Sequence, residues 1–384
     1  MTLLVAIDLP GGPAFVDALQ RAWDSGEAVL PLDQRLPAPA RQQVLDALAP
    51  GAVVDGSGRR ALAHGRPIED GDALVVATSG TTGQPKGVVL THAAVAASAR
   101  ATSARLGIDP DRHRWLACLP LSHVGGLSVV SRALLTGTPL EVHPGFDAAA
   151  VAAAAGPSVL VSLVATALRR VEAGRFHTVV LGGSAPPPGH ELPGNVVTTY
   201  GMTETGSGVV YDGVPLDGVE IAIGDGDEVR LRGPMLLRAY RDGTVPLDDD
   251  GWFATGDAGA IGSDGRLVVH GRLSDLIISG GENIWPAAVE AVLRRHPGIA
   301  EVVVAGRPDP EWGERVVAWV VPADPAAAPT LDELRAEVKE HLAPWAAPRR
   351  LVLLASLPKT SLGKVRRQDL APPGAGPESL PSTT

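Results

Sequence analysis

The sequence predicts an α/β protein with a large N-terminal domain and a small C-terminal domain. Over the first 200 residues, short apolar runs of strand length alternate with amphipathic or Ala-rich stretches of helical length. Such alternation is typical of parallel sheets covered by helices. Short strands and Gly/Asp turns prevail after Gly213, and helical periodicity returns after Gly271. We therefore expect layered αβ subdomains, then a small antiparallel or barrel-like subdomain, then a separate α+β domain.

The expected elements of the first part alternate regularly along the chain. Alanine runs such as 148–155 are strong helix formers and are assigned to helices. Strands are expected at short runs that are rich in apolar and β-branched residues. The expected strands are 3–7, 28–30, 74–77, 115–118, 140–143, 159–161, 178–181 and 196–199, and the helices include 14–23, 38–48, 93–105 and 127–135.

The second part of the chain contains a region of short strands and turns, followed by a region in which helices and strands are both expected. Thr330 and Glu333, three residues apart, form a capping box at the start of a helix. We place the N-terminal domain at 1–271 and the C-terminal domain at 276–370, with a boundary at 272–275 and a disordered tail at 371–384. The expected strands are 219–223, 229–231, 267–270, 301–305 and 316–321, and the expected helices are 286–296 and 331–342.

The composition argues against several classes of protein. A formal net charge of −10 without a long basic run argues against nucleic acid as a partner. The single cysteine, Cys118, excludes an internal disulfide and is expected to be a core thiol in a reducing compartment. The start of the chain reads as a first strand rather than a signal peptide, and no apolar run is long enough to span a bilayer. A cytoplasmic protein without an integral membrane segment is therefore expected.

A run of small and hydroxylated residues follows an apolar strand and ends in a lysine. Residues 74–87 read LVVATSGTTGQPKG. Small residues let the backbone approach an anion, N–H and hydroxyl groups donate to it, and an ammonium supplies compensating charge. The spacing differs from that of a Walker loop, so it predicts a phosphate cradle outside the P-loop fold, with a mobile surface loop as the alternative. The candidate phosphate ligands are Thr78, Ser79, Gly80, Thr81, Thr82, Gly83 and Lys86.

Four further motifs carry groups suited to a nucleotide. The ring of Tyr200 is suited to stack on a purine, and Glu204 is suited to hold Mg²⁺ against phosphate oxygens. Asp257 is suited to accept the hydroxyls of a ribose, and Arg272 to reach ribose or phosphate. Lys364, between a glycine and a valine, supplies a positive point charge. Each motif alone is also compatible with a solvated turn or a surface charge.

Taken together, the order and residue types of the five motifs resemble those of the adenylate-forming enzymes, which include acyl-CoA synthetases, nonribosomal peptide adenylation domains and luciferases. The resemblance covers residues 74–367. It implies a large domain of two αβ layers and a small barrel, followed by a mobile C-terminal domain. It also implies an enzyme that activates a carboxylic acid with ATP and Mg²⁺ and then passes the acyl group to a thiol, commonly that of coenzyme A. The family hinge falls within 272–275, where Ser274 replaces the usual Asp or Lys.

The same resemblance implies a role for each motif. Family members hold the β- and γ-phosphates on the cradle, while Thr203 and Glu204 serve the α-phosphate and Mg²⁺. Lys364 bridges the carboxylate and the α-phosphate during adenylation. Rotation of the C-terminal domain then brings the Gly281 segment to the pantetheine of coenzyme A. The implied nucleotide ligands are Asp257 and Arg272 for the ribose, and Gly183, Ser184, Ala185, Tyr200 and Gly201 around the adenine.

Residues 119–127, which read LPLSHVGGL, and Arg132 occupy the acyl-pocket position of the family. They resemble the corresponding part of the o-succinylbenzoate–CoA ligases of menaquinone biosynthesis. Arg132 is the candidate partner for a second carboxylate, with a helix-surface arginine as the alternative. His123 is the candidate pocket-wall residue that gates the thiol, with a buried structural histidine as the alternative. The implied substrate contacts are His123, Gly126, Arg132, Gly201 and Thr205.

Several alternatives stay open at this point. The acid is expected to be o-succinylbenzoate, but another aromatic or short-chain carboxylic acid fits the same motifs. The acceptor thiol is expected to be that of free coenzyme A, but a stand-alone adenylation enzyme that loads a carrier protein has the same motifs. A nucleotide-binding regulator without catalysis is a third class. A homodimer also stays open as the assembly.

Overall fold

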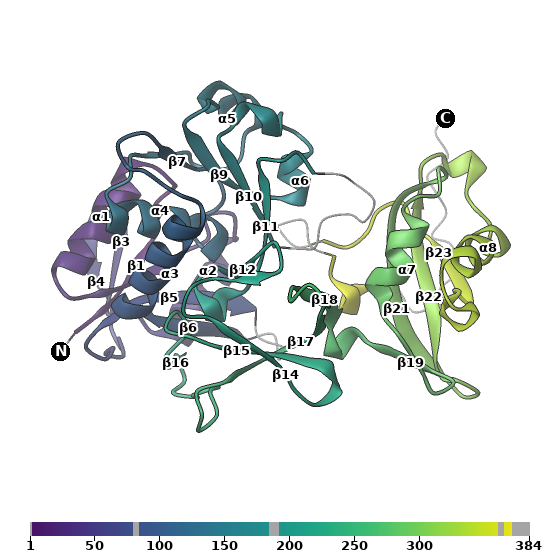
Figure 1. Ribbon diagram of the computed structural model, residues 1–384. Helices are drawn as coiled ribbons and strands as arrows, with labels where there is room; N and C mark the ends of the chain where they lie inside the picture. The colour runs from purple at the N-terminus through teal and green to yellow at the C-terminus, as the bar shows by residue number, and fades with distance from the viewer. Residues whose placement is uncertain (1, 80–83, 184–191, 360–364, 371–384) are drawn as a thin grey trace, which may run out of the picture. The chain divides into compact units, whose positions relative to one another are not determined.

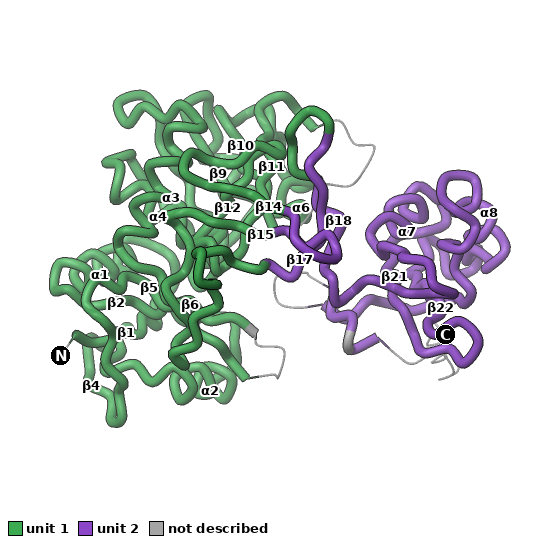
Figure 2. The backbone as a smooth tube through the Cα atoms, turned by 60° about the horizontal axis from the view of Figure 1, so that its bottom comes forward, with its two compact units in different colours: residues 1–222, 230–254, 263–267 green, residues 223–229, 255–262, 268–384 purple. Residues whose placement is uncertain are grey.

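A computed structural model describes residues 2–79, 84–183, 192–359 and 365–370 of the chain (Figure 1). The chain divides into two compact units, which Figure 2 shows in different colours. The predicted domain limits 1–271, 272–275 and 276–370 stay a prediction, and the predicted tail lies outside the described residues. The first unit consists of Met1–Ala222, Arg230–Ala254 and Ser263–Leu267, and the second of Ile223–Val229, Thr255–Gly262 and Val268–Thr384.

The first sheet has seven strands in the order β16-β6-β5-β2-β1-β3-β4. Strand β1 pairs in parallel with β2 and β3, because helices return the chain across the sheet between them. Val44 and Leu48 of α2 belong to the hydrophobic core against this sheet. The elements are β1 (Leu4–Ile7), α1 (Pro13–Asp24), β2 (Ala28–Pro31), α2 (Ala38–Leu48), β3 (Ala52–Asp55), β4 (Gly58–Ala61), β5 (Asp72–Ser79), β6 (Pro85–Thr91) and β16 (Ala239–Tyr240).

The second sheet also has seven strands, in the order β13-β12-β11-β10-β9-β7-β8. Its strands from β8 to β11 are parallel, and β12 and β13 add an antiparallel edge. Helices α3 and α4 pack against each other (Figure 1). The elements are α3 (His92–Arg105), β7 (Arg114–Ala117), α4 (Val124–Thr136), β8 (Leu140–Val142), α5 (Ala148–Ala154), β9 (Val159–Val164), α6 (Ala165–Leu168), β10 (Thr178–Gly182), β11 (Val196–Gly201), β12 (Gly208–Tyr211) and β13 (Val214–Pro215).

The remaining elements form one small sheet and one helix-covered sheet. The small sheet has the order β14-β15-β17-β18, and a second sheet of β20-β19-β22-β21 also pairs β23 with β22. Thr330 Oγ1 accepts from Glu333 N at 3.3 Å and Glu333 Oε2 accepts from Thr330 N at 2.7 Å, so the expected capping box is confirmed. The elements are β14 (Glu220–Ile223), β15 (Glu228–Arg232), β17 (Phe253–Ile261), β18 (Leu267–Arg272), β19 (Ile277–Ser279), β20 (Glu282–Ile284), α7 (Pro286–Leu293), β21 (Ile299–Asp309), β22 (Gly313–Pro322), α8 (Leu331–His341) and β23 (Arg350–Leu353).

Cys118 lies in the core beside β7 and has no exposed surface. Burial raises the pKa of this thiol to about 12, because the thiolate is disfavoured away from water. The expected core thiol is therefore confirmed. Among the described residues, no helix is long and apolar enough to cross a membrane.

Candidate active site

The predicted phosphate cradle lies at the turn between the antiparallel strands β5 and β6. Thr78 pairs with Lys86 and Ser79 with Pro85 in the strand register, and Thr78 Oγ1 donates to Lys86 O at 3.4 Å. The strand pairing thus brings the two flanks of the predicted cradle together. The four cradle residues Gly80, Thr81, Thr82 and Gly83 lie outside the described residues.

Tyr200 and Gly201 end β11, and Thr203, Glu204 and Thr205 form the single turn of 3₁₀ helix that follows. A side chain at Gly201 has no room, because its Cβ would lie 2.2 Å from Ser207 O. The buried Thr205 hydroxyl donates to Ser207 O at 2.6 Å and accepts from Met202 N at 2.9 Å. The hydrogen bonds of Thr205 therefore fix this turn, and Glu204 is its middle residue.

Tyr240 connects two predicted site residues that are far apart in the sequence. Its hydroxyl donates to Glu204 Oε1 at 3.0 Å. The Nζ atom of Lys86 lies 4.5 Å from the centre of the same ring. The structure thus brings the cradle lysine and the predicted Mg²⁺ ligand to one tyrosine.

The predicted ribose ligands contact each other within the second unit. Asp257, on β17, is buried, and its Oδ1 accepts from Arg272 Nε at 2.9 Å. Arg272 Nη1 also donates to Thr255 O at 2.9 Å, and Asp257 N donates to Thr255 Oγ1 at 3.1 Å. Backbone and side-chain hydrogen bonds therefore hold a buried carboxylate beside a guanidinium.

His123 is the residue before α4 and forms a cluster with two residues of the loop that follows β2. Its Nε2 atom lies 3.1 Å from Arg35 Nη2 and 3.4 Å from Asp33 Oδ2. Burial lowers the pKa of His123. The charge of Arg35 lowers this pKa further, whereas the charge of Asp33 raises it. Burial by itself raises the pKa of Asp33, but the hydrogen bonds from Arg35 outweigh it and hold this carboxyl below its usual pKa. The histidine thus faces an ion pair rather than a lone charge.

Arg132 is one of the largest fully buried side chains in the described part of the chain. Its Nη2 donates to Ser207 Oγ at 3.2 Å, and its guanidinium carbon lies 4.9 Å from the ring centre of Trp115. Its Nε and Nη1 atoms have no acceptor among the described residues. Burial lowers the pKa of this guanidinium, because the charge is removed from water. The structure therefore excludes the helix-surface alternative for Arg132.

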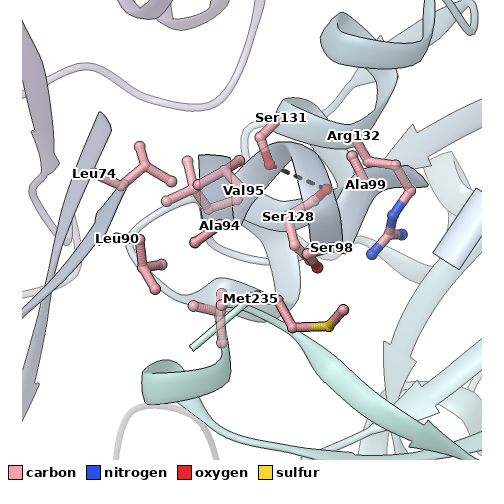
Figure 3. Close-up of a pocket in the computed structure, with 13 residues that line it drawn as sticks. Leu74, Leu90, Ala94, Val95, Ser98, Ala99, Ser128, Ser131, Arg132 and Met235 are labelled. Atoms are coloured by element: carbon pink, nitrogen blue, oxygen red, sulfur yellow. Dashed lines mark hydrogen bonds between the residues drawn. The ribbon is translucent and has the colours of Figure 1, made fainter. Parts of the chain in front are cut away.

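A small cavity runs along the face of α4 that meets α3 (Figure 3). Arg132 lies at one end of this lining, and Ser131 Oγ donates to Ser128 O at 3.3 Å within it. His123 is nine residues before Arg132, which is about 13 Å along a helix axis. His123 thus precedes the first residue of α4, whereas Arg132 lies in the C-terminal half of this helix. The lining consists of Leu74, Leu90, Ala94, Val95, Ser98, Ala99, Val124, Leu127, Ser128, Ser131, Arg132, Gly206 and Met235.

Gly126 lies in the first turn of α4 and has a structural reason to be glycine. A Cβ atom there would lie 2.4 Å from Leu119 O and 2.6 Å from Pro120 O. Its neighbour Gly125 has much more room, with Leu119 Cδ1 at 3.4 Å as the nearest atom. Gly126 therefore lets the start of α4 approach the preceding loop, and its predicted contact with substrate stays a prediction.

The other predicted site residues are only partly described. Gly183 has a positive φ of 84° just after β10, and Gly281 has a φ of 85° between β19 and β20. Ser184, Ala185 and Lys364 lie outside the described residues. Lys359 and Val365, which lie on either side of Lys364 in the sequence, pair in an isolated antiparallel β-bridge.

Sequence reasoning missed Asp33, Arg35, Ser207 and Tyr240. Asp33 follows the carboxyl end of the parallel strand β2, where α/β proteins commonly place ligand-binding side chains, so its position is a usable signal. No comparable signal marks Ser207 or Tyr240, because their roles depend on contacts with residues 75 and 36 positions away in the sequence.

Comparison with known proteins defines the class. Residues 63–240 match the AMP-binding enzyme family, and residues 288–364 match the AMP-binding enzyme C-terminal domain. A "Probable 2-succinylbenzoate–CoA ligase" of Mycobacterium tuberculosis is 39% identical over 366 residues, which cover 88% of this chain and 95% of the relative. The chain therefore belongs to the AMP-binding enzyme family of adenylate-forming enzymes.

Other relatives and solved structures indicate the same branch of the family. A 2-succinylbenzoate–CoA ligase of Listeria monocytogenes is 36% identical and covers 78% of this chain and 69% of its own length. The o-succinylbenzoate CoA synthetase of Bacillus subtilis in complex with the acyl-adenylate intermediate has a TM-score of 0.82 and 30% identity, covering 95% of this chain and 87% of its own. The same enzyme with ATP and a magnesium ion has a TM-score of 0.81 and 29% identity, covering 96% of this chain and 89% of its own.

Proposed function

We propose that this protein is an AMP-forming acid–CoA ligase that converts o-succinylbenzoate, ATP and coenzyme A into o-succinylbenzoyl-CoA, AMP and pyrophosphate. We choose this acid mainly because the guanidinium of Arg132 is buried and its Nε and Nη1 atoms have no acceptor among the described residues. o-Succinylbenzoate carries a second carboxylate that matches such a group. The relatives named above, which act on this acid, support the same choice.

The reaction has two steps in this proposal. A carboxylate oxygen of the acid attacks the α-phosphorus of ATP, the bond from that phosphorus to the bridging oxygen breaks, and pyrophosphate leaves. The sulfur of coenzyme A then attacks the acyl carbon, loses its proton, and AMP leaves with the electrons of the carbon–oxygen bond. Both substrates of the first step are anions, so cationic and hydrogen-bonding groups must offset their repulsion as charge develops.

The described residues fit the groups that this reaction needs. Mg²⁺ is commonly held by one or two carboxylates together with substrate phosphates. Glu204 is such a carboxylate. It accepts a hydrogen bond from Tyr240, and the ammonium of Lys86 lies against the ring of that tyrosine. When bound, the metal ion would neutralise phosphate charge. The roles of Asp257 and Arg272 toward the ribose and of Lys364 toward the reacting carboxylate stay proposals that rest on the family resemblance.

Other parts of the proposal rest on the family resemblance, on one cluster of residues or on the sequence alone. Gly281 is proposed to meet the pantetheine of coenzyme A, because the motif around it resembles that of the family. His123 is proposed to line the wall between the acid and the thiol, beside the Asp33–Arg35 ion pair. The cytoplasmic location and a homodimeric assembly stay predictions from the sequence.

An acid panel tests the proposal. Pyrophosphate release is measured with o-succinylbenzoate, benzoate and short-chain fatty acids at equal concentrations of ATP and coenzyme A. We expect kcat/KM to be highest for o-succinylbenzoate. A tenfold advantage of another acid, equivalent to about 1.4 kcal/mol in the barrier, would reject the assigned acid and leave the ligase class standing.

A further inference from the structure

Tyr240 is the residue that the structure places between two groups of opposite charge. Its hydroxyl donates to Glu204 Oε1 at 3.0 Å, and the ammonium of Lys86 lies 4.5 Å from its ring centre. Within the described part of the chain, no ion pair joins Lys86 to Glu204. The tyrosine therefore contacts both the lysine and the carboxylate.

The backbone around Tyr240 is fixed on both sides. Tyr240 pairs with Val88 of β6, two residues beyond Lys86, and Tyr240 N donates to Thr244 O at 2.8 Å. The next residue, Arg241, donates its backbone N–H to Gly87 O at 2.7 Å. The guanidinium of Arg241 donates to three more carbonyl oxygens, those of Leu48, Arg66 and Pro67.

The turn that carries Glu204 is tied to the same segment. Leu237 N donates to Glu204 O at 2.7 Å, three residues before Tyr240. The phenol of Tyr240 and the backbone of its own segment therefore hold one glutamate by two separate hydrogen bonds. This arrangement fixes the direction in which the carboxylate points before any ligand binds.

The two contacts of Tyr240 have different chemical consequences. A neutral phenol that donates to a carboxylate orients it and leaves its negative charge in place, so the carboxylate can still hold a cation. The ring face attracts the ammonium of Lys86 without donating or accepting a hydrogen bond, so the three N–H groups of the lysine stay available to an anion. A direct Lys86–Glu204 ion pair would instead satisfy both groups with each other.

We propose that Tyr240 is a positioning residue that holds Glu204 ready for Mg²⁺ and Lys86 ready for the phosphates of ATP, and prevents the two from pairing. The inference rests on the proposed function, because Glu204 and Lys86 are the metal and phosphate ligands there. It extends that function to a residue that no sequence motif marks.

Two substitutions separate the two contacts of Tyr240. Tyr240→Phe keeps the ring beside Lys86 and removes the hydrogen bond to Glu204. Tyr240→Leu removes both contacts. Tyr211→Phe is the matched control, because it removes a phenol hydroxyl of the same unit that lies 3.3 Å from Thr102 Oγ1. Thermal unfolding of each variant checks that it is folded.

Binding of a non-hydrolysable ATP analogue is measured by calorimetry with excess Mg²⁺ and with EDTA, so that no turnover is needed. For Tyr240→Phe we expect the affinity with Mg²⁺ to fall about tenfold and the affinity in EDTA to stay within about twofold of wild type. For Tyr240→Leu we expect the affinity in EDTA to fall as well, as in Lys86→Ala. Tyr211→Phe is expected to match wild type in both buffers.

Two results would overturn the inference. One is an unchanged Mg²⁺ effect in Tyr240→Phe, and the other is an equal loss with and without Mg²⁺ in that variant. If Tyr240→Leu does not fold, Tyr240→Phe and Lys86→Ala still decide the question. Failure of the proposed function is distinguishable, because the wild-type protein would then fail to bind the analogue or to release pyrophosphate.

Discussion

Arg132 Nη2 donates a hydrogen bond to Ser207 Oγ at 3.2 Å, while Nε and Nη1 of the same buried guanidinium have no acceptor among the described residues. A buried charge with unsatisfied donors destabilises a folded protein. A substrate carboxylate that reaches these donors would supply the missing acceptors. The stability of the ligand-free protein and the choice of acid are thus linked through one residue.

Replacing Arg132 by methionine is expected to remove the preference for a dicarboxylic acid. We expect kcat/KM for o-succinylbenzoate to fall about 100-fold, or about 3 kcal/mol, and that for benzoate to fall much less. Urea unfolding without substrate should show equal or greater stability, because the unpaired buried charge is gone. Arg105→Met, which removes an exposed arginine bonded to Tyr211 O at 3.3 Å, is the control. Equal losses with both acids, together with lower stability, would make Arg132 a purely structural residue.

The pKa of His123 predicts a pH dependence of stability. Burial lowers this pKa, so the unfolded chain takes up a proton at a higher pH than the folded protein. The free energy of unfolding is therefore expected to fall as the pH drops below about 6.5, the usual histidine value, until the folded pKa is reached. His123→Asn should lose less stability than wild type between about pH 7.5 and about pH 5.5 in urea unfolding.

Other histidines do not obscure this comparison. Burial also lowers the pKa of His92 and of His113, but both residues are present in wild type and variant, so their contributions cancel. The same loss of stability in the two proteins would contradict the assignment to His123.

Asp257 is expected to distinguish ATP from a nucleotide without ribose hydroxyls. A hydrogen bond to a charged group contributes about 1.5–3 kcal/mol, so wild type should bind ATP at least tenfold more tightly than 2′,3′-dideoxy-ATP. Asp257→Asn should bind the two alike. Calorimetric affinities measure both, and Asp264→Asn in an exposed turn is the control. A variant that still prefers ATP as strongly as wild type would remove Asp257 from the ribose site.

Gly126 and Gly125 provide a matched pair of substitutions on α4. In Gly126→Ala the new methyl group would lie 2.4 Å from Leu119 O, so the loop or the helix must shift. We expect this overpacking to lower the free energy of unfolding by about 1–3 kcal/mol. Gly125→Ala meets Leu119 Cδ1 at 3.4 Å and should be neutral or stabilising by up to about 1 kcal/mol, because Ala favours a helix. Similar values for both variants in urea unfolding would contradict the steric account.

The alternating part of the fold could be predicted from the sequence, because apolar residues recur with different periods in strands and in helices. The expected strand 3–7 is β1, and the expected helix 38–48 is α2. The run 85–91, which forms β6, was not among the expected strands. Its strand character depends on pairing with β5 and β16, and such pairing leaves no local signal.

The candidate site was predictable only where its residues lie in local motifs. Glu204 follows a strand and Asp257 lies within one, and each belongs to a recognisable sequence motif, so their chemical roles could be predicted. Tyr240 and Arg35 act through contacts with residues 36 and 88 positions away, and the spacing of residues along a chain does not encode such contacts. The burial of Arg132 was equally hidden, because α4 presents it to Trp115 rather than to solvent.

The identity of the acyl product tests the central claim most directly. The purified protein is incubated with o-succinylbenzoate, ATP, Mg²⁺ and coenzyme A, and the products are followed by mass spectrometry. The account predicts o-succinylbenzoyl-CoA in amounts equal to AMP, and no thioester when coenzyme A is left out. An acyl-adenylate that accumulates without reacting with coenzyme A would contradict the account and indicate a protein-bound acceptor thiol.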